Sequence, residues 1–303
     1  MKYLLTGATG FVGKVLVSKL LAGGDEVSIL SRNPAAVVLS FQGKCKGFMW
    51  SDMNSVPPAE AFENVDVVIN LMGEGVAEKR WTEDQKKKIY DSRINGTKKL
   101  IEQIAMLKQK PKTFISASAI GIYGTRNAEE LTEESSLGAD FLATVCKDWE
   151  TETFKAQNLG LRTAVIRIGV VLGKNGGALS KMLPIFKLGA GGPLGSGKQV
   201  MSWIHIEDLA SMFIFVAKNN QLKGIFNGTS PSPKNNKEFS KILGSVLKRP
   251  AFAPAPGFVM KLAFGEMSVI LLEGQKVLPK NMEKAGFEFK FPSLENAFKN
   301  ILN

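Results

Sequence analysis

An apolar run at the start of the chain ends in three glycines, and this segment constrains the fold more than any other. Gly7, Gly10 and Gly13 follow a short strand expected at 3–6 and open an apolar helix expected at 11–21. Glycine allows a positive φ in the turn and a close approach of phosphate to the backbone. The free N–H groups and the dipole of the helix favour an anion there. The segment therefore predicts a nucleotide-binding turn, with GxxGxxG spacing instead of GxGxxG.

Strands and helices alternate after this turn. The expected elements are strands at 26–30, 46–50, 65–71, 113–116 and 161–168, and long helices at 82–109 and 141–158. The run VDVVINL at 65–71 is almost continuously apolar and β-branched, as in a strand buried on both faces. The alternation predicts an α/β fold of the Rossmann type, with a doubly wound parallel sheet and right-handed crossovers.

Glycine-rich and proline-rich passages replace the regular alternation after residue 173. We expect residues 1–173 to form the nucleotide-binding domain, with 202–228 returning to it. Residues 174–201 and 229–303 are expected to form a smaller, mainly helical C-terminal domain on the substrate side.

Composition narrows the class of protein. The 303 residues are 44% hydrophobic and 22% charged, as in an ordinary globular chain. Two cysteines, Cys45 and Cys146, argue against a disulfide scaffold, and no Cys/His cluster suggests a metal site. The sequence has neither a signal-peptide pattern nor a run of eighteen apolar residues. We therefore expect a cytoplasmic protein that does not enter a membrane.

The net charge of +11 is concentrated in one segment. Eleven Lys/Arg residues against four acids lie between Lys79 and Lys112. Apolar residues recur there at helical spacing, so the lysines are expected to form a solvated helix face. No alternation of aromatic and basic residues accompanies the charge. We expect no nucleic-acid partner, and instead an anionic cofactor with a small-molecule substrate, for which an anionic or nucleotide-bearing compound is one option.

The residues that follow the second expected strand, Ser31-Arg32-Asn33-Pro34, bear on cofactor choice. Folds specific for NAD place an acid there to hold the ribose 2′-hydroxyl, whereas an arginine accommodates a 2′-phosphate. Arg32 stands at this position and favours NADP (NADPH), with an ordinary turn arginine as the alternative. The residues expected to bind the cofactor are Gly7, Thr9, Gly10, Phe11, Val12, Gly13, Arg32, Leu71, Gly73 and Ser116.

Motifs along the whole chain resemble one family. TGATGFVG at 6–13, SASAIGIYG at 116–124 and WIHIEDLA at 203–210 resemble an extended short-chain dehydrogenase/reductase of the epimerase/dehydratase class. GEGVAEKRW, SRINGT, GGPLGSGKQ and GEMSVILLEGQKVLP are similar to its atypical epimerase-like branch, sometimes described as nucleoside-diphosphate-sugar epimerases or cell-division-inhibitor homologues. The last of these segments marks a special C-terminal module. The resemblance implies an NADP-binding fold, and extended reductases often form homodimers through two long helices.

The catalytic pair of the wider superfamily is missing from this chain. Short-chain reductases generally use a tyrosine and a lysine four residues later that lowers the tyrosine pKa. The three tyrosines, Tyr3, Tyr90 and Tyr123, have no lysine at that spacing. In the helix at 141–158, register with the superfamily puts Leu142 at the tyrosine position and Cys146 at the lysine position. The resemblance therefore does not bring the usual acid/base chemistry with it.

Ser118 and Tyr123 remain as the catalytic candidates. Ser118 matches the superfamily's catalytic serine, and a slip of one or two residues would move the match to Ala119 or Ser116. Tyr123 is the surviving phenol beside it, suited either to shaping the substrate pocket or to proton transfer. A serine that satisfies loop backbone groups is the alternative for Ser118.

Four further residues are candidates on the substrate side. Glu74, Arg80 and Trp81 follow the fourth expected strand in a loop that would close over a ligand, with a solvated surface loop as the alternative. His205 is the only histidine and titrates near neutrality. It directly precedes a helix, so tethering of that helix is its alternative role.

Two functions are consistent with these residues. The first is an NADP-dependent, epimerase-like oxidoreductase of unknown substrate that works without a YxxxK pair. The second is a scaffold that senses NADP and has lost turnover.

Overall fold

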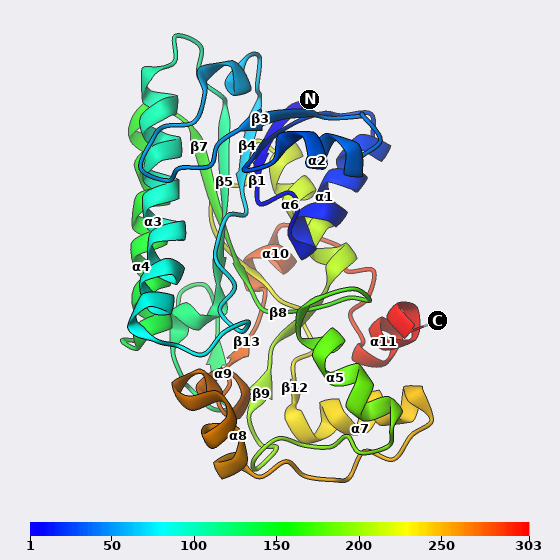
Figure 1. Ribbon diagram of the computed structural model, residues 1–303. Coiled ribbons are helices and arrows are strands. Elements are labelled where there is room, and N and C mark those ends of the chain that lie inside the picture. The colour runs from blue at the N-terminus through cyan, green and yellow to red at the C-terminus, as the bar shows by residue number, and fades with distance from the viewer. Residues whose placement is uncertain (303) are drawn as a thin grey trace.

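One parallel sheet forms the centre of the protein. The computed structural model describes residues 1–302 (Figure 1), and residue 303, the last of the expected C-terminal domain, lies outside the described residues. Seven strands pair in the order β11-β7-β5-β4-β1-β2-β3, all parallel. These strands are β1 (Lys2–Thr6), β2 (Glu26–Ser31), β3 (Lys46–Met49), β4 (Val67–Asn70), β5 (Thr113–Ala119), β7 (Arg162–Ile168) and β11 (Gly224–Gly228). The strand order reverses between β1 and β4, which confirms the predicted doubly wound Rossmann-type fold.

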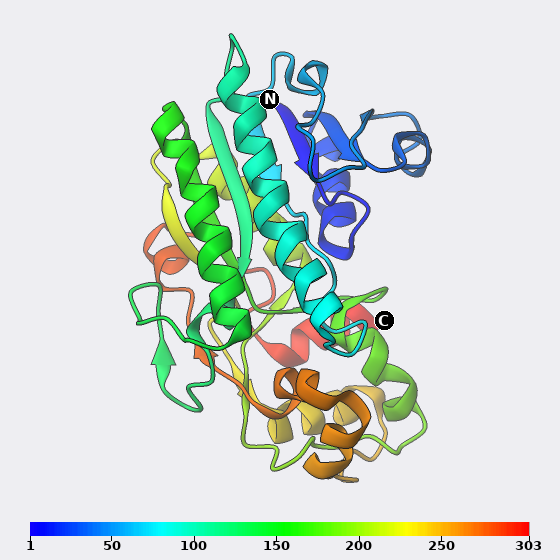
Figure 2. The ribbon, with the colours of Figure 1, turned by 60° about the vertical axis from the view of Figure 1, so that its left-hand side comes forward.

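Helices cover both faces of this sheet. The long helices α3 (Glu83–Met106) and α4 (Phe141–Phe154) pack side by side on one face, as Figures 1 and 2 show. On the other face α1 (Phe11–Ala22) packs against α6 (Ile206–Lys218), with α2 (Pro34–Ser40) beside the edge strands. Sheet and helices enclose a core rich in Val, Ile and Leu from strands that are buried on both faces.

The ends of the long helices follow local rules. The Thr82 side chain accepts a hydrogen bond from the Gln85 backbone N–H, and two acids occupy the first turn of α3. Asp140 caps α4 in the same way through the Ala143 N–H. The expected helix at 141–158 ends earlier as an α-helix, because the chain tightens into a 3-10 helix at Lys155–Leu159 before Gly160 takes a positive φ.

Strand β5 is longer than the sequence predicts. We expect it to end at 116, but it continues through Ala119, and each of its residues pairs with β7, including Ser118 opposite Arg167. The following 3-10 helix, Ile120–Tyr123, is short and buried on three of its four residues. Small side chains suggested a loop, and pairing with β7 overrides that preference. Ser118 therefore lies within the sheet and not in a loop.

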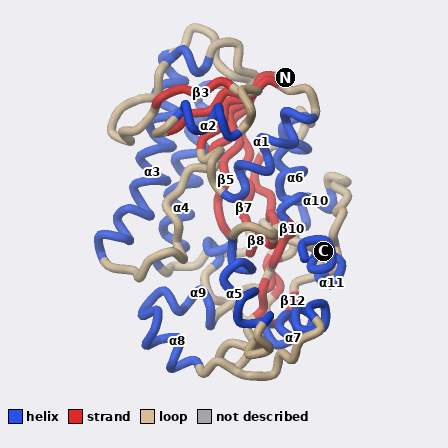
Figure 3. Tube along the Cα trace, turned by 45° about the vertical axis from the view of Figure 1, so that its right-hand side comes forward, coloured by secondary structure: helices blue, strands red, loops and turns tan. Residues whose placement is uncertain are grey.

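Short elements, most of which follow β7 in the chain, build a second part of the molecule (Figure 3). Its strands form two-stranded pairs: β8 (Val170–Leu172) with β10 (Trp203–His205), β9 (Val200–Met201) with β12 (Lys234–Asn235), and β6 (Glu130–Leu131) with β13 (Lys276–Val277). Its helices are α5 (Gly177–Lys187), α7 (Asn236–Leu247), α8 (Gly257–Phe264), α9 (Val269–Leu272), α10 (Lys280–Lys284) and α11 (Leu294–Leu302). A separate apolar cluster, including Trp203, Phe239 and Phe298, fills this part.

Two observations bear on membranes and metals. Within residues 1–302, no helix combines the length and the apolar character that crossing a bilayer requires. In the same described part of the chain, no group of three or more His, Cys, Asp or Glu side chains is arranged to hold a metal ion.

Candidate functional site

The glycine turn joins β1 to α1 at the carboxyl edge of the sheet. Gly7 has a φ of +65°, and a Cβ on it would lie 2.5 Å from the Leu71 carbonyl oxygen. A Cβ on Gly13 would lie 2.3 Å from the Gly7 carbonyl oxygen. The Gly10 N–H donates to that same Gly7 oxygen at 3.0 Å and closes the turn. The three predicted glycines thus form a cradle that any side chain would fill.

No side chain caps the amino end of α1. Gly10 is the N-cap residue and offers no side-chain hydrogen bond, and the first turn holds no acid. Side chains cap α2, α3, α4, α6 and α7, whereas α5, α8, α9 and α10 lack such a cap as α1 does. Open N–H groups at the positive end of a helix dipole suit an anion such as a pyrophosphate. Thr9, Phe11 and Val12 surround this amino end.

Three other predicted cofactor residues lie at the same edge, and the side chain of a fourth is already engaged within the protein. Arg32 is exposed at the end of β2, and Leu71 and Gly73 follow β4. Ser116 is different, because its fully buried hydroxyl donates to the Ala117 carbonyl and accepts from the Asn70 amide. Its side chain therefore holds β4 and β5 together, and only its backbone remains for a ligand.

A buried polar cluster that the sequence did not reveal fixes the end of β4. Asn70 accepts from Thr6 Oγ1 at 2.7 Å and donates to Thr97 Oγ1 at 2.8 Å. Trp149 Nε1 donates to the same Thr97 oxygen at 2.9 Å. The Leu71 N–H donates to Thr6 Oγ1. These bonds join β1, β4, α3 and α4, so the backbone that follows β4 is held rigidly against the glycine turn.

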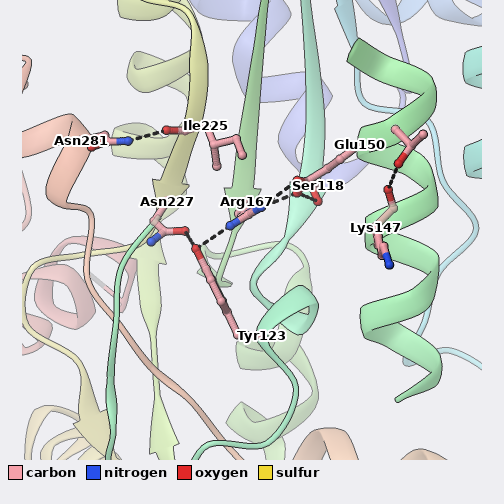
Figure 4. Close-up of polar contacts among 9 residues, drawn as sticks. Ser118, Tyr123, Lys147, Glu150, Arg167, Ile225, Asn227 and Asn281 are labelled. Carbon is pink, nitrogen blue, oxygen red and sulfur yellow. Dashed lines mark hydrogen bonds and ion pairs between the residues drawn. The ribbon is translucent and has the colours of Figure 1, made fainter. Parts of the chain in front are cut away.

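Ser118 and Tyr123, the catalytic candidates, lie in one buried hydrogen-bond network (Figure 4). Ser118 Oγ donates to Glu150 Oε1 at 2.7 Å. Arg167 donates to both oxygens of Glu150 at 2.8 Å and to the Tyr123 hydroxyl at 2.9 Å. The Tyr123 hydroxyl in turn donates to Asn227 Oδ1 at 2.7 Å. The network therefore crosses from α4 through β5 and β7 to β11.

The charges in this network balance one another. Burial alone would lower the pKa of Arg167, but hydrogen bonds and charge attraction from Glu150 raise it above its usual value. Burial raises the pKa of Tyr123, and Arg167 only partly opposes that rise. With exposures of 2% for Ser118 and 0% for Tyr123, neither hydroxyl reaches solvent. The geometry gives both a structural role, and their catalytic role stays a prediction.

The two residues that the expected register puts at the superfamily's tyrosine and lysine positions, Leu142 and Cys146, both lie on α4. Leu142 lies on α4, close to Gly121, where a Cβ would be 3.3 Å from the Leu142 Cβ. Cys146, one turn further along α4, is buried, and burial raises its thiol pKa to about 11. A thiol with such a pKa stays protonated at neutral pH and is a poor nucleophile.

The loop after β4 connects the sheet to the C-terminal part. The Glu74 N–H donates to Ser92 Oγ, and the Glu74 carboxylate accepts weakly from Gln85 at 3.4 Å. Trp81 packs edge-on against Phe141 with ring centroids 5.3 Å apart. Arg80 donates to the Leu262 and Ala263 carbonyls at the end of α8. Glu74 and Trp81 thus line the α3–α4 side, while Arg80 anchors α8.

His205 lies away from these groups, at the start of α6. Its Nδ1 accepts from the Glu207 N–H at 3.1 Å, so it caps the helix, and its ring lies 4.0 Å from that of Phe291. Burial lowers the His205 pKa to about 4. A cavity of about 600 Å³ lies beside the first turns of α1 and α6 and is lined by Thr9, Phe11, Lys14, Val15, Gly173, Lys174, Asn175, His205, Ile206, Glu207, Asn300 and Ile301.

Sequence reasoning missed Glu150, Arg167 and Asn227 of the buried network, and also Arg93. The apolar spacing of α4 places Glu150 on the buried face of the helix. A charged residue on such a face is the signal that could have indicated a buried ion pair. Arg93 is one of several basic residues on α3, so nothing in the sequence distinguishes it from the lysines around it.

A parallel doubly wound sheet with a glycine turn before an uncapped helix defines a dinucleotide-binding α/β protein. A sequence model of the NAD dependent epimerase/dehydratase family matches residues 3–227, and one for a domain of unknown function (DUF1731) matches residues 255–301. The chain belongs to the NAD dependent epimerase/dehydratase family.

Relatives in distant organisms match along nearly the full length. An epimerase family protein SDR39U1 homologue from the chloroplast of Arabidopsis thaliana is 41% identical, covering 100% of this chain and 87% of the relative. Epimerase family protein YfhF of Bacillus subtilis is 39% identical, with coverage of 100% and 98%. Among solved structures, human SDR39U1 with NADPH has a TM-score of 0.89 at 36% identity and covers 99% of both chains.

Proposed function

We propose that the protein is an NADPH-binding oxidoreductase of the epimerase family that works without a YxxxK pair. The uncapped amino end of α1 above the glycine cradle carries this proposal. It is supported by Arg32 at the end of β2 and by the NADPH bound to a structure 36% identical to this chain.

The residues present fit such a cofactor. Gly7, Gly10 and Gly13 leave room for the pyrophosphate at the start of α1, and Arg32 is free to meet a 2′-phosphate. Leu71 and Gly73 would border the cofactor at the end of β4. When bound, the nicotinamide would supply the hydride, while the chain binds, orients and excludes water.

This protein must transfer protons differently from other short-chain reductases, because it has no YxxxK pair. Leu142 and Cys146 replace the tyrosine and lysine, and the hydroxyls of Ser118 and Tyr123 are engaged inside the protein. Loss of positioned acid/base chemistry typically removes a factor of about 10² to 10⁴ in rate. The proposal therefore favours a substrate whose reduction needs little proton assistance, such as an activated double bond or an already polarised carbonyl.

The same observations support an alternative, an NADP-sensing scaffold without turnover. A panel of activated alkenes and polarised carbonyl compounds distinguishes the two, with NADPH oxidation followed at saturating NADPH. Turnover of any compound supports the oxidoreductase. Tight NADPH binding with no turnover across the panel supports the scaffold.

Cofactor choice has its own test. Calorimetric titration should show tighter binding of NADPH than of NADH, and Arg32→Ala should weaken NADPH binding by about 10- to 100-fold, the worth of a charge-assisted hydrogen bond. Lys44→Ala is the matched control. Lys44 is an exposed cation that precedes β3, so it lies at the amino ends of the strands, whereas Arg32 lies at their carboxyl ends. Equal affinities of the unmutated protein for NADPH and NADH would contradict the proposal.

A further inference from the structure

Arg93 is a cation with little of its hydrogen-bonding capacity used. Arg93 lies on α3, and its guanidinium carbon is 5.3 Å from the centre of the ring of Trp149, which is a residue of α4. The guanidinium also lies against the backbone after β4, where a Cβ on Gly73 would be 2.9 Å from Arg93 Cζ and Nη2. Two surfaces therefore hold this group beside a predicted cofactor residue.

The protein does not neutralise this charge. Across residues 1–302, Arg93 makes one hydrogen bond, from Nη1 to the Ile89 carbonyl at 3.0 Å, and no ion pair. An arginine has five N–H donors and stays charged in proteins, so Nε and Nη2 retain donors without a protein acceptor. Burial lowers the pKa of Arg93, and the charge of Glu74 opposes this shift only in part. Half-buried cations without a counter-charge are costly, and an anion at this place would relieve that cost.

Arg93 lies close to Cys146 on the facing helix α4. The guanidinium is close enough to Cys146 to oppose the rise in the thiol pKa, so its charge is felt on α4. Here the charge comes from the facing helix α3, which packs against α4 (Figure 2). A planar guanidinium, unlike an ammonium, presents paired donors that match the two oxygens of a carboxylate or a phosphate.

We propose that Arg93 binds an anionic group of the substrate, a carboxylate or a phosphate, next to the cofactor-binding end of β4. This inference rests on the proposed function, since it assigns a substrate class to the proposed cofactor site. A bidentate contact there would fix the orientation of the substrate relative to the cofactor. A cation at this point would also stabilise negative charge that develops on a hydride acceptor.

The test uses the full-length protein saturated with NADP⁺, so that the cofactor already fills the phosphate-binding end of α1. Acetate, malonate and inorganic phosphate are titrated calorimetrically into the unmutated complex and into Arg93→Met and Arg93→Lys. We expect at least one probe to bind the unmutated complex, about 10- to 100-fold more weakly to Arg93→Met, and with intermediate affinity to Arg93→Lys. Binding of the organic acids alone indicates a carboxylate, and binding of phosphate alone indicates a phosphate.

Lys88→Met is the matched control, because Lys88 is an exposed cation on the same helix. It should leave probe binding unchanged. NADP⁺ affinity is measured for every variant and shows that each is folded. Three outcomes overturn the inference: no probe binds the unmutated complex, Arg93→Met binds probes as well as the unmutated protein, or Arg93→Met loses cofactor affinity as Arg32→Ala does. If the unmutated protein binds no NADP⁺ at all, it is the proposed function that fails.

Discussion

Arg167 and Arg93 both lie next to α4, yet the protein treats their charges differently. Arg167 is 2% exposed, and Glu150 and Tyr123 occupy its guanidinium from two sides. Arg93 is half-buried and donates to a single backbone carbonyl. The first arginine is part of a closed framework that joins α4, β5, β7 and β11. The second lies beside Gly73 after β4 with donors left over, which is what a ligand-binding group requires.

The largest expected effect comes from breaking the closed framework. Glu150→Gln leaves the Arg167 charge buried without its partner and should lower the free energy of unfolding by about 3 to 5 kcal/mol. Urea denaturation followed by circular dichroism measures the loss. Glu134→Gln is the control, since Glu134 is exposed, and it should change little. A loss below about 1 kcal/mol for Glu150→Gln would show that the framework does not depend on this ion pair.

Removal of the Tyr123 hydroxyl tests the same framework more gently. Tyr123→Phe leaves an Arg167 N–H and the Asn227 oxygen without a partner, so we expect a loss of about 1 to 3 kcal/mol in the free energy of unfolding. Tyr3→Phe is a matched control, because Tyr3 is equally buried but its hydroxyl makes only a long contact, 3.6 Å, to a methionine sulfur. If Tyr123→Phe also leaves the rate of NADPH oxidation unchanged, Tyr123 has no catalytic role.

His205 extends the comparison to a buried group that must stay neutral. Its pKa is about 4 in the fold against an ordinary 6.5, so the unfolded chain binds the extra proton first. The stability that depends on neutral His205 is complete above pH 6.5 and is lost as the pH falls towards 4, by about 1 to 2 kcal/mol after allowance for solvent screening. His205→Asn keeps a good N-cap residue and should flatten this part of the pH profile. Identical slopes in both proteins would exclude the role.

The smallest expected change in stability belongs to Arg93. Arg93→Met removes one hydrogen bond and a contact with the Trp149 ring but keeps an apolar side chain, so the free energy of unfolding should fall by less than about 1 kcal/mol. The same denaturation experiment measures it beside Glu150→Gln. A loss as large as that of Glu150→Gln would make Arg93 a framework residue and remove the contrast between the two arginines.

Much of the fold follows from local patterns. The glycine turn was predictable because only glycine fits the positive φ and the 2.3 to 2.5 Å approaches at Gly7 and Gly13. The strand at 65–71 was predictable from its β-branched run, although hydrogen bonding narrows it to Val67–Asn70. Arg32 was placed correctly at the end of β2 from spacing alone.

The polar interior was not predictable in the same way. Ser118 reads as a loop residue because its neighbours are small, and only pairing with β7 places it inside the sheet. The partnership of Glu150 with Arg167 joins residues 17 positions apart on different elements, and no periodicity indicates it. Arg93 is one basic residue among eleven in its segment, so only the positions of Gly73 and Trp149 show that it lies between α4 and the loop after β4.

A crystal structure of the protein with NADP⁺ and malonate would test the central claim most directly. The account predicts the pyrophosphate at the amino end of α1, the 2′-phosphate at Arg32, and the malonate carboxylate on the free donors of Arg93. The contacts of Arg167 with Glu150 and Tyr123 should be unchanged. Cofactor bound elsewhere, or malonate bound to the Arg167 framework with Arg93 left without an anion, would contradict the account.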